Sequence, residues 1–130
     1  LALELGGAYA DEAVGSWRRH ARLVSRDQVT VSDRWELAAG VRGAVSYVLA
    51  GDVVLGSNDR GEFARVMPLE GARPVVLRWS GSAVQASLVE RELDDPYQVA
   101  SWGGRVTRLD LVAAEPGSGE LNVSVEVEVR

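Results

Sequence analysis

The side chains best suited to chemistry lie in one stretch, residues 17–37, which carries the single histidine of the chain. His20 could serve as a general base or acid. Three arginines near it, Arg18, Arg22 and Arg34, could bind an anionic substrate, because guanidinium groups match carboxylates and sulfates. The alternative is a solvated strand face, or one packed against another domain, with arginine stems covering apolar surface. We favour this structural interpretation.

Nucleophilic and metal chemistry have little support. Ser32 is the expected neighbour of His20, but such a pair would hydrogen-bond on any polar sheet face, and no GxSxG turn is present. Cysteine is absent, and a single histidine does not suffice for the usual protein zinc sites. We therefore expect no catalytic, cofactor-binding or metal-binding residue.

Four tryptophans could form a stacking platform for sugar rings: Trp17, Trp35, Trp79 and Trp102. Because the chain has only one phenylalanine, most of these tryptophans are expected in the core. Trp102, between a serine and two glycines, is the one expected to be accessible. The candidate glycan contacts are therefore Arg18, His20, Arg22, Tyr97 and Trp102.

A β-hairpin must position the residues of the stretch 17–37. If residues 25–27 form a three-residue loop, four cross-strand pairs share one face: Leu23 with Val29, Ala21 with Val31, Arg19 with Asp33, and Trp17 with Trp35. Side chains alternate between faces along a strand, so a one-residue slip would break every one of these matches. The other face then holds Arg18, His20, Arg22, Thr30, Ser32 and Arg34, and is polar.

The remaining chain shows strand patterns separated by glycine-rich turns and no helical period of useful length. Strands are expected at 1–5, 41–50, 53–55, 63–68, 75–80, 83–92, 98–102, 105–113 and 121–129. Residues 75–80 and 83–92 are expected to pair as a hairpin through Ser80, Gly81 and Ser82. The pattern predicts an all-β fold, an antiparallel β-sandwich of about nine or ten strands in a single domain, residues 1–130.

Charge and length restrict the partners. The 130 residues carry a net charge of -5, which disfavours general affinity for nucleic acid. No apolar run approaches the roughly 18 residues needed to span a bilayer, so we expect no membrane partner. The sequence starts with leucine, and we expect it to be the C-terminal fragment of a longer protein.

Three segments together resemble a known family. They are AYADEAVGSWRRHARLVSRDQVTVSDRWEL (8–37), PVVLRW (74–79) and LDDPYQVASWGGRVTRLDL (93–111). They are similar to the C-terminal β-sandwich region of heparinase II/III-like polysaccharide lyases, where a Tyr and a Trp-Arg-Arg strand precede a hairpin ending in a Val-x-Val-x-Asp strand. The family's Ala-His-Asn motif and its preceding helical toroid are absent here, so the resemblance assigns no catalytic residue.

The resemblance implies an accessory domain that braces the upstream catalytic domains of the same chain, in a parent enzyme that cleaves uronic-acid polysaccharides by β-elimination. It also implies a periplasmic or secreted bacterial setting and an acidic polysaccharide as a possible partner. Two alternatives stay open: an independent carbohydrate-binding module, which would use the candidate glycan contacts, and an immunoglobulin-like interaction module of a surface protein.

Overall fold

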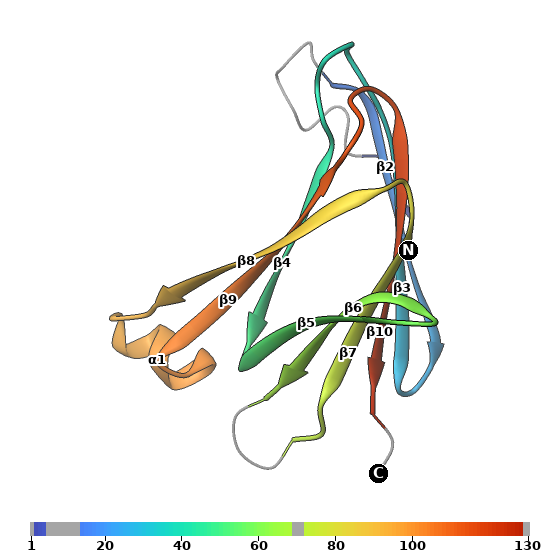
Figure 1. Ribbon diagram of the computed structural model, residues 1–130. Coiled ribbons are helices and arrows are strands. Elements are labelled where there is room, and N and C mark those ends of the chain that lie inside the picture. Colours follow the sequence, from blue (N-terminus) through green and yellow to red (C-terminus); the bar gives the residue numbers. More distant parts are fainter. Residues whose placement is uncertain (1, 5–13, 69–71, 129–130) are drawn as a thin grey trace.

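The computed structural model describes residues 2–4, 14–68 and 72–128, and within these ranges the chain folds into two antiparallel sheets (Figure 1). The elements in chain order are β1 (Ala2–Glu4), β2 (Val14–Ser25), β3 (Gln28–Leu37), β4 (Ala44–Ala50), β5 (Asp52–Asn58), β6 (Gly61–Met67), β7 (Val75–Gly81), β8 (Val84–Glu92), α1 (Pro96–Trp102), β9 (Arg105–Ala113) and β10 (Gly119–Val127). The predicted all-β sandwich is confirmed.

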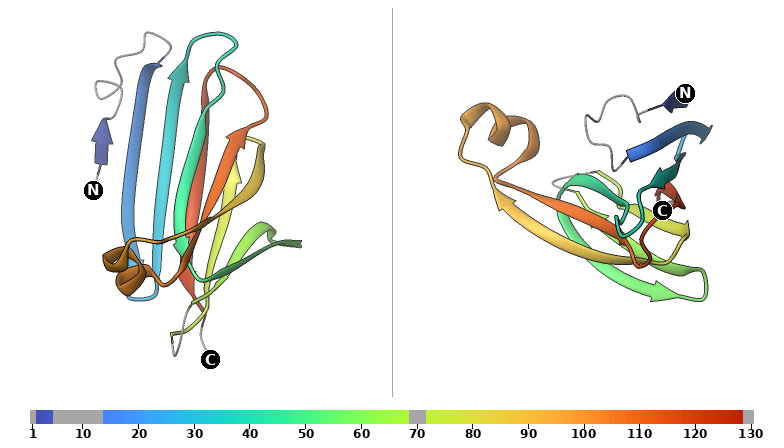
Figure 2. Two further views of the ribbon diagram at one scale, coloured as in Figure 1. Left: turned by 90° about the vertical axis from the view of Figure 1, so that its left-hand side faces the viewer. Right: turned by 90° about the horizontal axis from the view of Figure 1, so that it is seen from above.

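The two sheets differ in width. The larger has seven strands in the order β1-β2-β3-β10-β7-β6-β5, and the smaller has three, in the order β4-β9-β8. The chain passes between the layers after β3, β4, β7 and β9, as the views in Figure 2 show. The last strand in sequence, β10, thus lies in the middle of the larger sheet, between β3 and β7.

The β2–β3 hairpin has the predicted register. Trp17 lies opposite Trp35, Arg19 opposite Asp33, and Leu23 opposite Val29. The predicted three-residue loop is wrong, since Ser25 pairs with Gln28 and the pairing shifts between Leu23 and Ser25. A two-residue turn at 26–27 with an irregularity before it therefore replaces that loop, and the faces of both strands are unchanged.

The core fills the space between the sheets. Trp35 and Trp17 stack with their ring centroids 4.9 Å apart. From β9 of the smaller sheet, four side chains are buried: Thr107, Leu109, Leu111 and Ala113. From β10, Leu121 and Val123 have no exposed surface. The regular alternation along these strands explains why their faces are predictable.

Two predicted elements are wrong. Strands β7 and β8 do not form a hairpin but belong to different sheets. Gly81, at φ +115°, turns the chain out of the larger sheet, and the Ser82 amide donates to the Glu120 carbonyl of β10. The expected strand at 98–102 is the helix α1, because Asp95 accepts hydrogen bonds from the Tyr97 and Gln98 amides as N-cap and Pro96 begins the first turn.

Candidate functional site

The structure separates the predicted glycan contacts into two groups. Arg18, His20 and Arg22 are exposed on the outer face of β2, in the larger sheet. Tyr97 lies in α1, the helix that connects β8 to β9 in the sequence, and is 86 % exposed. Trp102 ends the same helix, and its side chain lies outside the described part of the structure. Figure 1 and the right-hand view of Figure 2 show α1 well away from β2, so these residues do not form one site.

Strand register defines the surface around His20. In one row across four strands, His20 lies opposite Ser32, Ser32 opposite Asn122, and Asn122 opposite Ser80. In the neighbouring row, the corresponding residues are Arg22, Thr30, Ser124 and Arg78. We call these eight residues the outer polar rows. They come from β2, β3, β10 and β7, strands far apart in the sequence.

Charged, polar and apolar residues border the outer polar rows, with Val76 of β7 among the apolar ones. On one side, Arg34 donates to Glu120 over 3.1 Å. At the far end, the guanidinium carbon of Arg78 lies 5.1 Å from the ring centroid of Phe63, within cation–π range. From the next row, the Gln28 side-chain amide donates to the Ser124 hydroxyl over 3.0 Å. The outer polar rows thus carry hydroxyl, amide, imidazole and guanidinium groups.

The opposite face of the same hairpin holds a buried ionic group. Asp33 is 1 % exposed, and its carboxylate accepts 2.9 Å hydrogen bonds from the Trp17 indole nitrogen and from the Arg19 Nε. A second contact from Arg19 to the other carboxylate oxygen measures 3.2 Å. The bidentate pair satisfies the buried charge, so this group is structural. Sequence analysis paired Arg19 with Asp33 but did not identify the link to Trp17.

Tyr47 of β4 packs near this group from the other sheet. Burial raises the pKa of the Tyr47 phenol to about 12, and the negative charge of Asp33 adds to the rise. The Tyr47 hydroxyl is buried and has no hydrogen-bond partner in the described structure. At neutral pH this phenol stays protonated and cannot act as a base.

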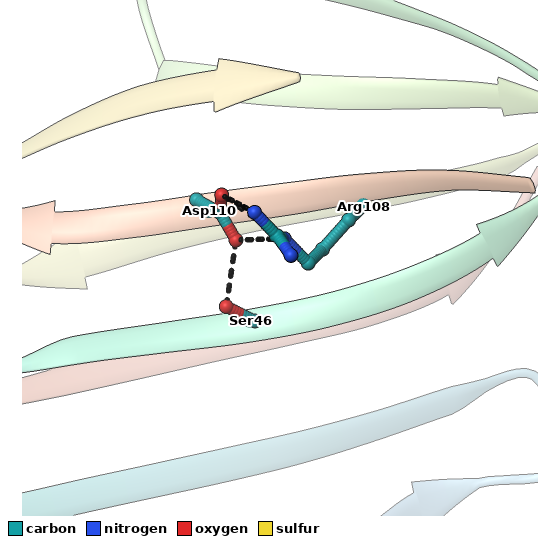
Figure 3. A network of polar contacts seen from close by, with 3 residues as sticks. All are labelled: Ser46, Arg108 and Asp110. Atoms are coloured by element: carbon teal, nitrogen blue, oxygen red, sulfur yellow. Dashed lines mark hydrogen bonds and ion pairs between the residues drawn. The ribbon is translucent and has the colours of Figure 1, made fainter. Parts of the chain in front are cut away.

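The outer face of the smaller sheet carries a second polar group, shown in Figure 3. Asp110 accepts a 2.7 Å hydrogen bond from the Ser46 hydroxyl and a 2.8 Å contact from the Arg108 Nε. The Ser46 hydrogen bond, followed by that from Arg108, lowers the pKa of the Asp110 carboxyl below its usual range. The Asp110 carboxylate and the Arg108 guanidinium thereby balance each other's charge, and both belong to β9.

Beside this pair lies a groove between the smaller sheet and the chain leading into α1. Its volume is about 410 Å³. Apolar side chains contribute to its lining, and two of them are strongly exposed: Val48 at 56 % and Val89 at 43 %. The full lining consists of Val48, Val89, Arg91, Glu92, Leu93, Asp94, Gln98, Val106 and Arg108. We call it the apolar groove. Sequence analysis missed it, because the outward valines of β4 and β8 meet only after the sheet has assembled.

A larger cleft of about 610 Å³ opens at the side of the sandwich, lined by residues of β5, β6, β7, β8 and β9. The single carboxylate in its lining, Glu62, accepts a 3.1 Å hydrogen bond from the Trp79 indole nitrogen. Trp79 itself is 9 % exposed. As expected for most of the tryptophans, Trp17, Trp35 and Trp79 are core residues and form no open platform.

The described residues offer little for catalysis. Across 2–4, 14–68 and 72–128, no three His, Cys, Asp or Glu side chains gather to hold a metal ion. His20 does lie opposite Ser32, but on an exposed sheet face rather than in a pocket. Neither the apolar groove nor the side cleft includes His20 in its lining. The arrangement can bind through hydrogen bonds and charge.

Comparison with known proteins adds no family. No protein-family model matches the chain, and no curated protein matches it. In the part of the chain that the structure describes, no helix has the length and apolar character required to cross a bilayer. The fold and surface therefore define the class, a β-sandwich with a polar sheet face on one layer and an apolar groove on the other.

Proposed function

We propose that this chain is a non-catalytic accessory β-sandwich domain of a heparinase II/III-like polysaccharide lyase, whose parent enzyme cleaves uronic-acid polysaccharides by β-elimination. Its role is to brace the upstream domains. The observation that carries this role is the apolar groove, in which Val48 and Val89 stand exposed on the outer face of the smaller sheet. Clustered exposed apolar side chains with a polar rim are typical of a surface that another protein unit covers.

The composition of the groove suits a neighbouring domain in the same chain. Interfaces between domains are more polar than those of obligate dimers, and the groove mixes valines with a charged rim. Arg108 is already paired with Asp110, which lowers the cost of bringing its charge to an interface. Tyr97, next in sequence to the groove residue Gln98 and 86 % exposed on α1, offers such a partner an aromatic side chain.

The first experiment is to sequence the reading frame upstream of Leu1. A long helical region followed by an Ala-His-Asn segment supports the proposal, whereas further sandwich repeats or a signal peptide directly upstream contradict it. The second experiment places Val89→Asp in the full-length protein. We expect a lower melting temperature for the neighbouring domain, because the new charge would be buried at the interface.

A matched control is Val54→Asp, at a valine 61 % exposed on β5 in the larger sheet. It should leave the neighbouring domain unchanged. In the isolated 130-residue chain, both substitutions should alter stability by no more than about 0.5 kcal/mol, as is usual at exposed positions. Equal effects of the two substitutions in the full-length protein would contradict a brace that acts through the apolar groove.

A second candidate function is an independent carbohydrate-binding or immunoglobulin-like interaction module. The observation that favours binding is the exposed, hydrogen-bonding outer face of the larger sheet. For the immunoglobulin-like alternative, the upstream sequence should contain more sandwich domains in place of a helical toroid. The same upstream sequence therefore separates these candidates.

A further inference from the structure

The larger sheet ends at β5, and the outer edge of this strand is not paired with any described strand. Figure 2 shows the β5–β6 hairpin at the end of the sheet opposite β1. Two large apolar side chains are exposed on the two faces of β5: Val54 at 61 % and Leu55 at 37 %. We propose that β5 pairs antiparallel with β5 of a second copy of this chain, which joins the two larger sheets across a two-fold axis. This inference does not rest on the brace function, because the apolar groove lies on the smaller sheet.

Charge distinguishes β5 from the other edge strands. Charged side chains on an edge strand oppose its pairing with another chain. Among the described strands, the two sheets end at β1, β4, β5 and β8. β1 includes Glu4, and β8 ends in the charged run 90–92. β4 is uncharged, but its exposed Val48 lines the apolar groove. Between Val53 and Ser57, β5 has neither a charged residue nor a proline, so this segment is open to pairing.

The sequence of β5 is self-complementary in one antiparallel register. With Val54 opposite Val54 of the second copy, Val53 lies opposite Leu55, and the two-fold axis repeats that pair. The core-facing row across the interface is then apolar throughout, with two residues from each copy: Val66, Val53, Leu55 and Ala64. A register that places Leu55 opposite itself would instead set Val53 against Ser57. Cross-strand apolar pairs stabilise a sheet, so the first register is favoured.

The backbone of β5 can supply the hydrogen bonds for this register. The β5–β6 hairpin closes with Asn58 opposite Gly61 over a two-residue turn, so Asn58 bonds toward β6. Backbone groups alternate in direction along an antiparallel strand. The amides and carbonyls of Val53 and Leu55 therefore point to the open edge. There, each of the two opposed Val53–Leu55 pairs can exchange two hydrogen bonds.

The charges beside the edge are already paired within one chain. Arg65, on the neighbouring strand β6, contacts Glu128 over 2.7 and 2.9 Å. Asp52, which would lie opposite a glycine of the second copy, is engaged by Arg105. The register therefore places no two like charges of β5 directly opposite each other. Because each copy has one β5 edge, the contact closes as a dimer and does not extend into a fibre.

The association is tested with the 130-residue chain itself. A contact of about five residues per copy is smaller than a standard interface, so we expect a weak dimer with a Kd on the order of 100 µM. In sedimentation equilibrium, the mass should rise from that of the monomer at about 10 µM toward that of the dimer at about 1 mM. The concentration-dependent amide shifts in NMR spectra should centre on β5 and β6.

A charge at position 54 tests the two-fold pairing. Val54→Asp and Val54→Arg should each weaken association at least tenfold, because two like charges would then lie opposite each other. Each variant is first checked for dispersed amide resonances. An equimolar mixture of the two variants should associate again, because the opposed side chains then carry opposite charges. The matched control is Val48→Asp, at a valine 56 % exposed on the smaller sheet, which should change association less than twofold.

Single cysteines test the register, since the chain has no cysteine of its own. Val54→Cys should form an intermolecular disulfide with oxidised glutathione at about 1 mM protein, because the opposed Cβ atoms lie within reach. In Ser57→Cys the two sulfur atoms would stand roughly 20 Å apart, and the yield should be at least tenfold lower. A chain that stays monomeric at this concentration, a mixture of the charged variants that does not associate, an equal loss in Val48→Asp, or equal disulfide yields would each overturn the proposal.

Discussion

Asp33 is a charged residue in the core, and its contacts explain how the fold tolerates it. The carboxylate accepts hydrogen bonds from the indole of Trp17 and from Nε and Nη2 of Arg19, whose own side chain is 34 % exposed. The pair thus joins the interior to the surface, and water can still solvate the guanidinium. Removing one partner would leave buried polar groups without their match.

We therefore expect Asp33→Ala to lower the free energy of unfolding by about 3 kcal/mol, the usual order for breaking a largely buried pair. Urea unfolding followed by tryptophan fluorescence measures this loss. Asp59→Ala, in the exposed turn between β5 and β6, removes an equal charge and should cost no more than about 0.5 kcal/mol. Similar costs at the two positions would show that the buried contacts contribute little.

Tyr47 makes stability depend on alkaline pH. Its folded pKa is about 12, above the usual value of 10.0, so between these two values the unfolded chain loses a proton that the folded chain keeps. Stability is therefore complete below about pH 10 and falls as the pH rises toward 12. Tyr47→Phe should reduce this pH-dependent loss of stability by roughly 1–2 kcal/mol. The loss is measured as the difference in the free energy of unfolding, from urea curves, between pH 8 and pH 11.5.

At pH 8 the same substitution should be close to neutral or slightly stabilising, because the Tyr47 hydroxyl is buried without a partner. A clear loss at pH 8 would instead indicate a hydrogen bond to this hydroxyl. The sequence could not reveal this residue. Its neighbours Asp33 and Arg19 belong to the other sheet, and strand alternation predicts which face a side chain occupies but not what the opposite sheet presents.

The segment between β3 and β4 packs against the Trp35 ring. A Cβ atom at Gly43 would stand 2.5 Å from a ring carbon of Trp35, which is only 1 % exposed. Since the ring is also stacked on Trp17, it has little room to move. We expect Gly43→Ala to destabilise the fold by about 1–3 kcal/mol, the range for overpacking a core, as measured by chemical denaturation.

Gly104 provides the control for that substitution. A Cβ atom there would meet nothing within 4 Å, and its φ is not in the left-handed region. Gly104→Ala should therefore stay within about 0.5 kcal/mol of the unsubstituted chain. If both alanine variants are equally stable, the core around Trp35 must relax more than its packing indicates.

Strands in which apolar and polar residues alternate regularly were predictable, whereas elements that depend on turn geometry were not. Strand β9 has the predicted bounds, and the β2–β3 register followed from matched apolar and charged pairs. The supposed β7–β8 hairpin failed because a Gly-containing link can also carry the chain to the other layer. The strand expected at 98–102 failed because an aspartate N-cap followed by proline, Asp95 and Pro96, begins a helix there.

At the scale of the whole molecule, β10 joins the two halves of the larger sheet. It pairs with β3 on one side and with β7 on the other. A chain ending at Gly117 would leave β3 and β7 each with one open edge and remove the fully buried Leu121 and Val123 from the core. We expect this truncated chain to lack dispersed amide resonances in NMR spectra, whereas a chain ending at Val127 should retain them.

Sheet order also explains why the candidate glycan contacts could be only partly predicted. The outward direction of Arg18, His20 and Arg22 followed from the hairpin alone. Their distance from Tyr97 did not, because the placement of α1 depends on which layer receives β8 and β9. Local sequence patterns do not indicate which of the two sheets a strand joins. In addition, the β10 residues of the outer polar rows lie about 90 residues farther along the chain than their β3 partners.

The position of β10 has a consequence for synthesis on the ribosome. Strands β1, β2 and β3 emerge early, but the neighbour that closes the inner edge of β3 is made after every other strand of the sheet. Until then, the growing chain presents two open strand edges and an uncovered tryptophan pair, features that favour association with other chains. Nascent copies on one messenger are therefore expected to need a chaperone, or wide spacing between translating ribosomes, for high yield.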